Sequence, residues 1–234
     1  MSNMLLWPWE KLPKNMQNES VRPYYESLKK KTAHLVCKRV IDIFFSILFI
    51  IPLLPIYLLV ALAVKLDSKG PVLFRQERVK QFGKPFFILK YRTMVVDAQK
   101  IGAQVTAKND SRVTRVGRFL RASRIDEIPQ LFNVLKGDMT FVGTRPEVPR
   151  YVLHYSDEMR ATLLLPPGVT GTASIAYRNE NKLLEENEDP ERTYIEKILP
   201  EKMAYNLDYL KKVSVKYDFI VMGRTVKCVF EKDE

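Results

Sequence analysis

The stretch Ser123-Arg-Ile-Asp-Glu-Ile-Pro-Gln-Leu-Phe-Asn-Val-Leu-Lys-Gly-Asp-Met-Thr-Phe-Val-Gly-Thr-Arg-Pro146 decides the fold around it. Four apolar residues follow the i, i+3, i+4, i+7 spacing of one helix face: Ile128, Leu131, Phe132 and Leu135. Gly137 ends the predicted helix, because glycine accepts a positive φ. Pro129 would clash with the carbonyl four residues earlier, so the helix cannot begin much before Asp126. We therefore expect the adjacent carboxylates of Asp126 and Glu127 on its first turn.

A helix N-terminus attracts anions, because its free N–H groups carry about half a positive charge. Arg121 and Arg124 lie just before this turn, which would strengthen the attraction. Residues 139–143 read as a buried strand, and the loop that follows carries Arg145, a planar donor suited to phosphate oxygens. The alternative is that Asp126 is only a helix cap and Arg145 only a surface arginine.

This run resembles the signature of the bacterial sugar transferases, the monotopic polyprenyl-phosphate phosphoglycosyl transferases. The matching pattern is Arg121-x4-Asp126-Glu127-x-Pro129-Gln130-Leu131-x-Asn133-Val134-Leu135-x-Gly137-Asp138-Met139-x2-Val142-Gly143-x-Arg145-Pro146. Smaller matches occur at Lys90-Tyr-Arg-Thr-Met94 and Pro167-Gly-Val-Thr-Gly171. The resemblance extends from about Lys38 to the C-terminus.

The resemblance implies transfer of a sugar 1-phosphate from a UDP-sugar to polyprenyl (undecaprenyl) phosphate, with release of UMP. It is the first membrane step of bacterial surface glycan assembly in that family, for capsule, exopolysaccharide, O-antigen or glycoprotein. Asp126 would be the nucleophile that holds the phosphosugar covalently, and Glu127 would support it. Mg²⁺ would bridge the diphosphate and these two carboxylates. The sequence names neither the sugar nor the glycan.

The resemblance also implies a set of phosphate- and substrate-binding residues: Arg121, Gly143, Thr144, Arg145 and Pro146, with Lys90 and Arg92. Two strands are predicted at 72–78 and 85–92, separated by a turn at 80–84. Lys90 and Arg92 alternate along the second strand and so share one face, which would otherwise be an ordinary solvated face. Arg178, which follows the turn-rich loop 166–171, is a further candidate anion ligand.

The charge balance favours anionic partners. Among 234 residues, 38 basic and 27 acidic side chains give a net charge of +11. Two cysteines, Cys37 and Cys228, make no disulfide framework, and two isolated histidines make no zinc site or catalytic triad. Two other functional classes remain as alternatives to an enzyme. One is a basic, membrane-tethered nucleic-acid-binding protein, and the other is a non-catalytic membrane scaffold. We expect UDP-sugar, polyprenyl phosphate and membrane lipids as partners, and no nucleic acid. A homodimer remains open.

The apolar run from Val40 to Val64 contains Asp42 as its only charge. Its last 22 residues would measure about 33 Å as a straight helix, enough to cross a bilayer core. However, Pro52 and Pro55 interrupt it, and basic residues flank both ends. We therefore predict a re-entrant helix with its break at these prolines and both ends in the cytoplasm. An ordinary kinked spanning helix is the alternative.

The expected architecture is a small membrane-associated α/β domain with an N-terminal re-entrant membrane helix and surface amphipathic helices. Residues 1–37 form an N-terminal segment, either interfacial through Trp7 and Trp9 or loosely packed. Residues 38–66 form the re-entrant helix, and 67–234 the catalytic domain. We expect it at the cytoplasmic face of the bacterial inner membrane.

Two further local features are predicted. Thr114 should cap a short helix that carries Arg118 and Arg121, and Gly117 should interrupt the helical pattern there. Apolar residues at helical spacing near the C-terminus would lie either on the membrane or on the core: Phe219, Met222, Val226 and Phe230.

Overall fold

The structure is a computed structural model that describes residues 6–96, 98, 110–185 and 189–230. Its α-helices are α1 (Arg22–Lys29), α2 (Thr32–Asp67), α4 (Arg115–Ala122), α5 (Gln130–Lys136), α6 (Pro149–Val152), α7 (Thr172–Ala176), α8 (Glu180–Glu185), α9 (Pro190–Thr193), α10 (Leu199–Lys212) and α11 (Val215–Phe230). Shorter helical turns are η1 (Trp9–Lys11), η2 (Lys14–Met16), η3 (Gln81–Gly83), η4 (Ile125–Glu127), η5 (Met159–Leu164) and η6 (Tyr194–Ile198). The strands are β1 (Leu73–Val79), β2 (Pro85–Tyr91), β3 (Thr140–Val142) and β4 (Gly168–Thr170). A mixed helix and strand composition is therefore confirmed, with small sheets.

The segment before α5 differs from the predicted helix start. Asp126 and Glu127 lie on the separate 3₁₀ turn η4, and α5 begins only at Gln130. The reason is Pro129, which has no N–H to donate to the carbonyl of Ile125. That carbonyl instead accepts from Ile128 N at 3.2 Å, which closes a tighter turn. Gly137 ends α5 with φ 89°, as predicted.

Both predicted strands flanking the turn are present. β1 and β2 pair in antiparallel register, with Phe74 opposite Lys90. The loop 166–171 holds more structure than predicted, because β4 within it pairs in parallel with β3. Gly168 permits this pairing, since a Cβ there would lie 2.2 Å from the backbone N of Gly143. The parallel pairing of β3 and β4 therefore positions the loop that carries Arg145.

The predicted cap at Thr114 is confirmed, because its Oγ1 accepts a hydrogen bond from Gly117 N at 3.0 Å. The expectation that Gly117 interrupts the helix was wrong. Gly117 lies inside α4, where a Cβ would meet the carbonyl oxygen of Thr93 at 2.1 Å. Glycine is needed there because α4 approaches the chain leaving β2 very closely.

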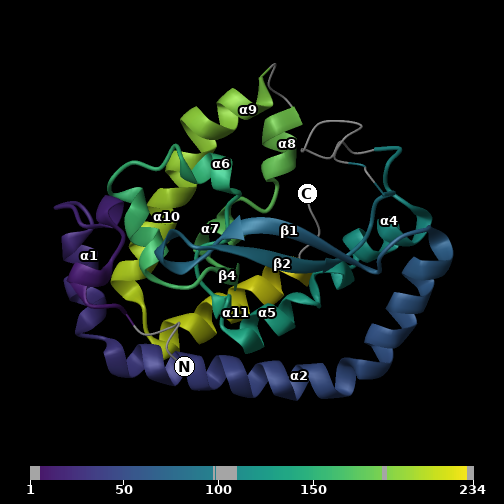
Figure 1. The fold of residues 1–234 in the computed structure, drawn as a ribbon, viewed down its shortest axis with the longest axis horizontal. Helices are drawn as coiled ribbons and strands as arrows, with labels where there is room; N and C mark the ends of the chain where they lie inside the picture. The colour runs from purple at the N-terminus through teal and green to yellow at the C-terminus, as the bar shows by residue number, and fades with distance from the viewer. Residues whose placement is uncertain (1–5, 97, 99–109, 186–188, 231–234) are drawn as a thin grey trace.

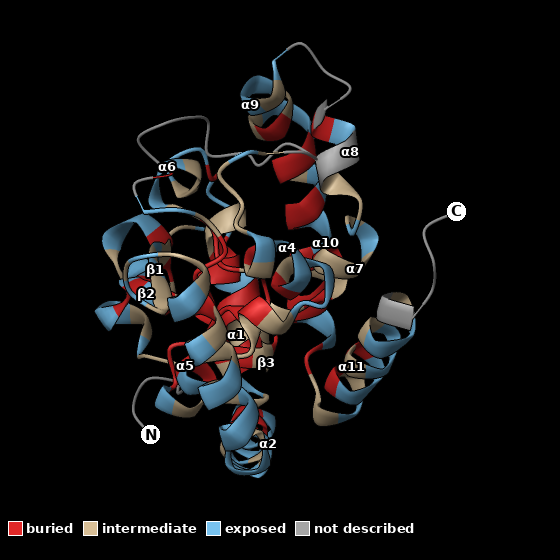
Figure 2. Cartoon of the chain, turned by 90° about the vertical axis from the view of Figure 1, so that its right-hand side faces the viewer, coloured by how far each residue is buried: buried red, intermediate tan, exposed pale blue. Residues whose placement is uncertain are grey.

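The N-terminal segment packs into the main core. Met16, Leu28 and Met203 of α10 belong to the same buried cluster. Trp7 stacks on Phe82 with ring centroids 4.3 Å apart. The alternative of a loosely packed terminus therefore does not hold for the described part of this segment. Figure 2 shows the buried residues gathered in the middle of the domain, with exposed faces on α2 and α11.

Helix α2 is long and apolar enough to cross a membrane by length and composition. Figure 1 shows it running along the base of the domain and then turning up along one side. Only 11% of its most apolar 18-residue window is buried in the protein. Phe219 and Val226 of α11 are also exposed, and the Phe219 ring lies 6.4 Å from that of Phe45. Such an exposed apolar surface is suited to contact with a membrane.

Both ends of α2 are attached to the same domain. At the N-terminal end, Lys38 Nζ donates to Asp218 Oδ2 at 2.6 Å and to the Val142 carbonyl at 2.8 Å. At the C-terminal end, Asp67 Oδ2 accepts from Val116 N of α4 at 3.0 Å. These contacts fix how α2 meets the domain that carries the site.

Candidate active site

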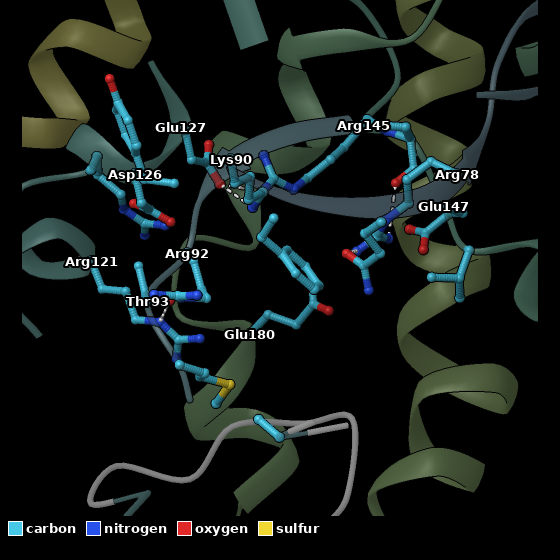
Figure 3. A pocket seen from close by; sticks show the side chains of 18 of the residues that line it. Arg78, Lys90, Arg92, Thr93, Arg121, Asp126, Glu127, Arg145, Glu147 and Glu180 are labelled. Atoms are coloured by element: carbon cyan, nitrogen blue, oxygen red, sulfur yellow. Dashed lines mark hydrogen bonds and ion pairs between the residues drawn. The ribbon is translucent and has the colours of Figure 1, made fainter. Parts of the chain in front are cut away.

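A cleft of about 810 Å³ opens between the β1–β2 sheet, the turn η4, the loop after β3 and the helices α8 to α10. Its charged lining residues are Arg78, Lys90, Arg92, Arg121, Arg124, Asp126, Glu127, Arg145, Glu147, Glu180, Glu191 and Lys202. Figure 3 shows most of these side chains converging on one space. The turn η4 presents the paired carboxylates, and β2 presents Lys90 and, just past its end, Arg92.

Glu127 is held by two cations. Its Oε1 accepts from Lys90 Nζ at 2.7 Å and from Arg145 Nη2 at 2.9 Å. Burial alone would raise the pKa of Glu127, but the charges of Arg145 and Lys90 outweigh it and hold that pKa well below its usual value. Glu127 is therefore a carboxylate that stays ionised in the folded protein.

Asp126 lies in a different environment. It is 9% exposed, and burial together with the charge of Glu127 raises its pKa, while Lys90 and Arg121 oppose that rise. Arg121 is held in place from α4, because its Nε donates to Thr93 Oγ1 at 2.8 Å. Adjacent carboxylates with opposite pKa shifts are common at catalytic sites, where the two groups take different roles.

The remaining residues predicted on the loop after β3 divide into two groups. Pro146 lines the cleft, and its carbonyl accepts from Arg78 Nη1 at 3.2 Å. Gly143 and Thr144 are not among the cleft-lining residues. Their backbone groups bond to the second strand pair, with Gly143 N donating to Thr170 O at 2.9 Å and Thr144 O accepting from Gly168 N at 2.8 Å. They shape the loop that presents Arg145.

Of the two predicted anion ligands Arg92 and Arg178, only Arg92 lines the cleft. Arg92 is buried, lines the cleft and donates from Nη2 to the Ser68 carbonyl at 2.7 Å. Arg178 donates to the carbonyl of Cys228 on α11 at 3.3 Å and is not among the residues that line the cleft. The structure therefore does not bring Arg178 to the other residues predicted to bind phosphate.

A second polar cluster in the cleft was missed by the sequence reasoning. Glu147 Oε1 accepts from Tyr194 OH at 2.7 Å and from Lys202 Nζ at 3.4 Å. Lys202 also pairs with Glu180 at 2.9 Å. The position of Glu147, two residues after Arg145 in an extended loop, was a usable signal, since alternate residues share a face. No sequence pattern near Lys202 indicated that it would contact Glu147, because the two residues lie 55 positions apart.

The paired carboxylates suit a magnesium ion that also binds substrate phosphates. No group of three or more His, Cys, Asp or Glu side chains suited to a metal exists among the described residues. Mg²⁺ commonly takes only one or two carboxylates from the protein and completes its shell with water and phosphate oxygens. Asp126 and Glu127 on η4 fit that donor set.

Paired carboxylates among several buried cations, beside a long apolar helix, form a cleft suited to anionic, phosphate-bearing ligands near a membrane. The chain belongs to the bacterial sugar transferase family, whose sequence profile matches residues 33–232. The expected family is therefore confirmed.

The chain is also similar to proteins named as undecaprenyl-phosphate sugar-phosphate transferases. A Bacillus subtilis (strain 168) protein, provisionally named an undecaprenyl-phosphate N-acetylgalactosaminyl 1-phosphate transferase, is 46% identical over 67% of this chain and 87% of its own length. The UDP-glucose:undecaprenyl-phosphate glucose-1-phosphate transferase of Caulobacter vibrioides is 38% identical over 84% of this chain and 70% of its own. The enzyme of the same name from Escherichia coli K12 is 36% identical over 90% of this chain, which spans 44% of that relative.

Proposed function

We propose that this protein transfers a sugar 1-phosphate from a UDP-sugar to undecaprenyl phosphate, releases UMP and so initiates a bacterial surface glycan. The observation that carries the proposal is Asp126, a buried carboxylate beside a Glu127 that Lys90 and Arg145 already neutralise. The names of the relatives support both substrates. The sugar stays open, because those names include glucose, galactose and N-acetylgalactosamine.

The reaction proceeds in two displacements. In the first, a carboxylate oxygen of Asp126 attacks the β-phosphorus of the UDP-sugar. A phosphorus–oxygen bond forms to Asp126, the bond to the α-phosphate oxygen breaks, and UMP leaves with that electron pair. In the second, an oxygen of undecaprenyl phosphate attacks the same phosphorus and releases the Asp126 carboxylate. The product is a diphosphate-linked lipid sugar.

The neighbouring residues stabilise charge in both steps. Arg145 and Lys90 would face the phosphate oxygens as these gain charge, and Arg121 lies on the other side of Asp126. Mg²⁺ held by Asp126 and Glu127 would supply further neutralisation of the diphosphate. Glu127 keeps Arg145 and Lys90 together before substrate arrives.

The re-entrant topology is part of the same proposal. It is supported by the attachment of both ends of α2 to one domain, through Lys38 and Asp67. A straight spanning helix would carry one end to the opposite side of the bilayer. Pro52 and Pro55 lie between the two attachments, where each removes a backbone hydrogen bond. Both ends would then face the cytoplasm.

A lipid-free assay tests the mechanism. With a UDP-sugar that supports turnover, and with Mg²⁺ but no lipid, the protein should release up to one UMP per active site. It should retain the sugar phosphate covalently until undecaprenyl phosphate is added. Steady-state rates should follow a ping-pong pattern. Turnover in the full reaction with no lipid-free UMP would exclude the covalent intermediate, and no turnover with any UDP-sugar would exclude the function.

A further inference from the structure

Arg92 is a buried cation whose hydrogen-bonding groups are only partly used. It is 5% exposed. Its Nη2 donates to Ser68 O at 2.7 Å and to Ser68 Oγ at 2.9 Å. Its Nε and Nη1 are buried without a hydrogen-bond partner among the described residues. Arg145, in contrast, is paired with Glu127. Arg92 is thus a buried guanidinium with two unpartnered donors in the wall of a cleft, an arrangement suited to an anion that arrives from outside.

The position of Arg92 is next to the end of the membrane helix. Ser68, its partner, directly follows the last residue of α2. Gly70 lies against the guanidinium with φ 126°, and a Cβ there would stand 2.0 Å from Arg92 Nη1. The next residue, Thr93, accepts the hydrogen bond from Arg121. Arg92 and Arg121 therefore lie close together (Figure 3), and Ser68 places Arg92 beside the C-terminal end of α2.

The two ends of the cleft differ in chemistry. Beside Arg92, Thr93 and Arg121 the lining also includes apolar residues: Pro71, Met94, Val95 and Val96, with Phe74 on β1 opposite Lys90. Val96 is 49% exposed and packs toward Gly70, on the same side as Arg92. The other end is lined by Glu147, Tyr194 and Lys202, which are charged or polar. A phosphate on a hydrocarbon chain matches the first end, whereas a nucleotide sugar matches the second.

We propose that Arg92, together with Arg121, binds the monophosphate of the polyprenyl acceptor, with the first isoprene units against Phe74, Val95 and Val96. The inference rests on the proposed function, which supplies the acceptor. The diphosphate of the donor then occupies the separate site formed by Lys90 and Arg145. Asp126 lies between the two phosphate sites, with Glu127 on one side and Arg121 on the other (Figure 3).

Equilibrium binding tests the division without requiring turnover. The full chain in detergent micelles is titrated calorimetrically with a water-soluble ten-carbon isoprenyl monophosphate, the corresponding isoprenol, inorganic phosphate and UDP. Arg92→Gln should weaken isoprenyl monophosphate binding at least tenfold and change UDP binding less than twofold. The isoprenol should bind weakly to both proteins. Tighter binding of isoprenyl monophosphate than of inorganic phosphate would assign the site to the lipid.

Matched variants separate a specific site from general attraction to a basic protein. Arg75→Gln removes the same charge from an exposed position on β1 outside the cleft and should leave isoprenyl monophosphate binding unchanged. Val96→Asp adds a carboxylate beside Arg92 at an exposed position and should weaken the same binding at least tenfold more than Val96→Asn, which removes only the apolar contact. If Arg92→Gln lowers the yield of folded protein, the comparison of Val96→Asp with Val96→Asn tests the lipid-phosphate site in its place.

The outcomes for the site and for the reaction are distinguishable. Unchanged isoprenyl monophosphate binding in Arg92→Gln and Val96→Asp would overturn the assignment, even in an active transferase. Equal losses of isoprenyl monophosphate and UDP binding would also overturn it, because one shared site would then serve both. Arg92-dependent lipid phosphate binding in a protein without turnover would support the site and reject the proposed reaction.

Discussion

Arg145 holds Glu127 across the cleft, with Nη2 of the arginine 2.9 Å from Oε1 of the glutamate. The two residues lie 18 positions apart, on either side of α5 and β3. The contact connects the turn η4 to the loop after β3, so the two carboxylates and the loop predicted to bind phosphate are positioned together. Because Glu127 neutralises part of their positive charge, Arg145 and Lys90 can lie close together in the cleft before substrate binds.

Replacing Arg145 should impair both halves of the reaction. Arg145→Ala removes a charge aimed at the transferred phosphate, and such losses reduce kcat by about 100-fold or more. Arg145→Lys should recover only part of the rate, since an ammonium lacks the planar pair of donors. Rates of lipid-free UMP release and of lipid product formation measure the effect. Arg150→Ala on the exposed face of α6 is the control and should behave as wild type. An Arg145→Ala defect confined to one half would contradict a shared role.

Asp126→Asn should abolish turnover while leaving stability nearly unchanged. Asp126 lies inside η4, whose N-cap is Arg124, so its side chain does not cap that turn, and asparagine has the same shape without the buried charge. Thermal unfolding and UMP release should be measured on the same preparation. If the variant retained more than about a tenth of the rate, equivalent to only about 1.4 kcal/mol of barrier, Asp126 would not be the nucleophile.

Single cysteines test the topology of α2. Lys30 and Lys69 are exposed and flank the helix, so each is replaced by cysteine in a background without Cys37 and Cys228. In intact cells, neither cysteine should react with a membrane-impermeant thiol reagent until the cells are lysed. Labelling of one cysteine alone would indicate a spanning helix. Replacing Pro52 and Pro55 with Ala should shift the segment towards that state, because the remaining apolar run is long enough to cross.

The buried pair of Lys38 and Asp218 should matter greatly for stability. It joins residues 180 positions apart at 2.6 Å. Lys38→Met leaves Asp218 as an uncompensated buried charge and should cost about 3–5 kcal/mol of unfolding free energy. Combining it with Asp218→Asn should restore part of the loss. Lys212→Met, which breaks an exposed pair with Asp208, should cost less than about 1 kcal/mol. Equal effects at the two pairs would contradict the buried role of Lys38.

Two glycines make a matched test of helix packing. Gly117→Ala forces a Cβ to within 2.1 Å of the Thr93 carbonyl oxygen and should destabilise the protein by about 1–3 kcal/mol. It should also lower activity, because Thr93 positions Arg121. A Cβ at Gly223 in α11 meets nothing within 4 Å, so Gly223→Ala should be neutral or stabilise by up to about 1 kcal/mol. Thermal unfolding of both variants checks this, and a stable, active Gly117→Ala would refute the close approach.

Local chemistry determined the features that were predictable from the sequence. The alternation of apolar and polar residues predicted β1 and β2. Thr114 predicted the N-cap of α4, and Gly137 predicted the end of α5. The sequence also contained the motif around Asp126 and Glu127 that identified the family. Each of these signals lies within a few residues of what it predicts, and its physical cause is the backbone preference or side-chain pattern of those residues.

Tertiary structure decided which distant side chains meet. Glu147 and Lys202 share the cleft although 55 positions separate them, and Arg178 turns instead toward α11. The free donors of Arg92 became visible only once the end of α2 and Gly70 were packed against it. No sequence periodicity reports such contacts, because they depend on how separately formed helices and strands fill space together. The sequence by itself therefore determined the elements and the two carboxylates, and the packing of α2, α4 and α10 around the sheet decided the shape and charge of the cleft.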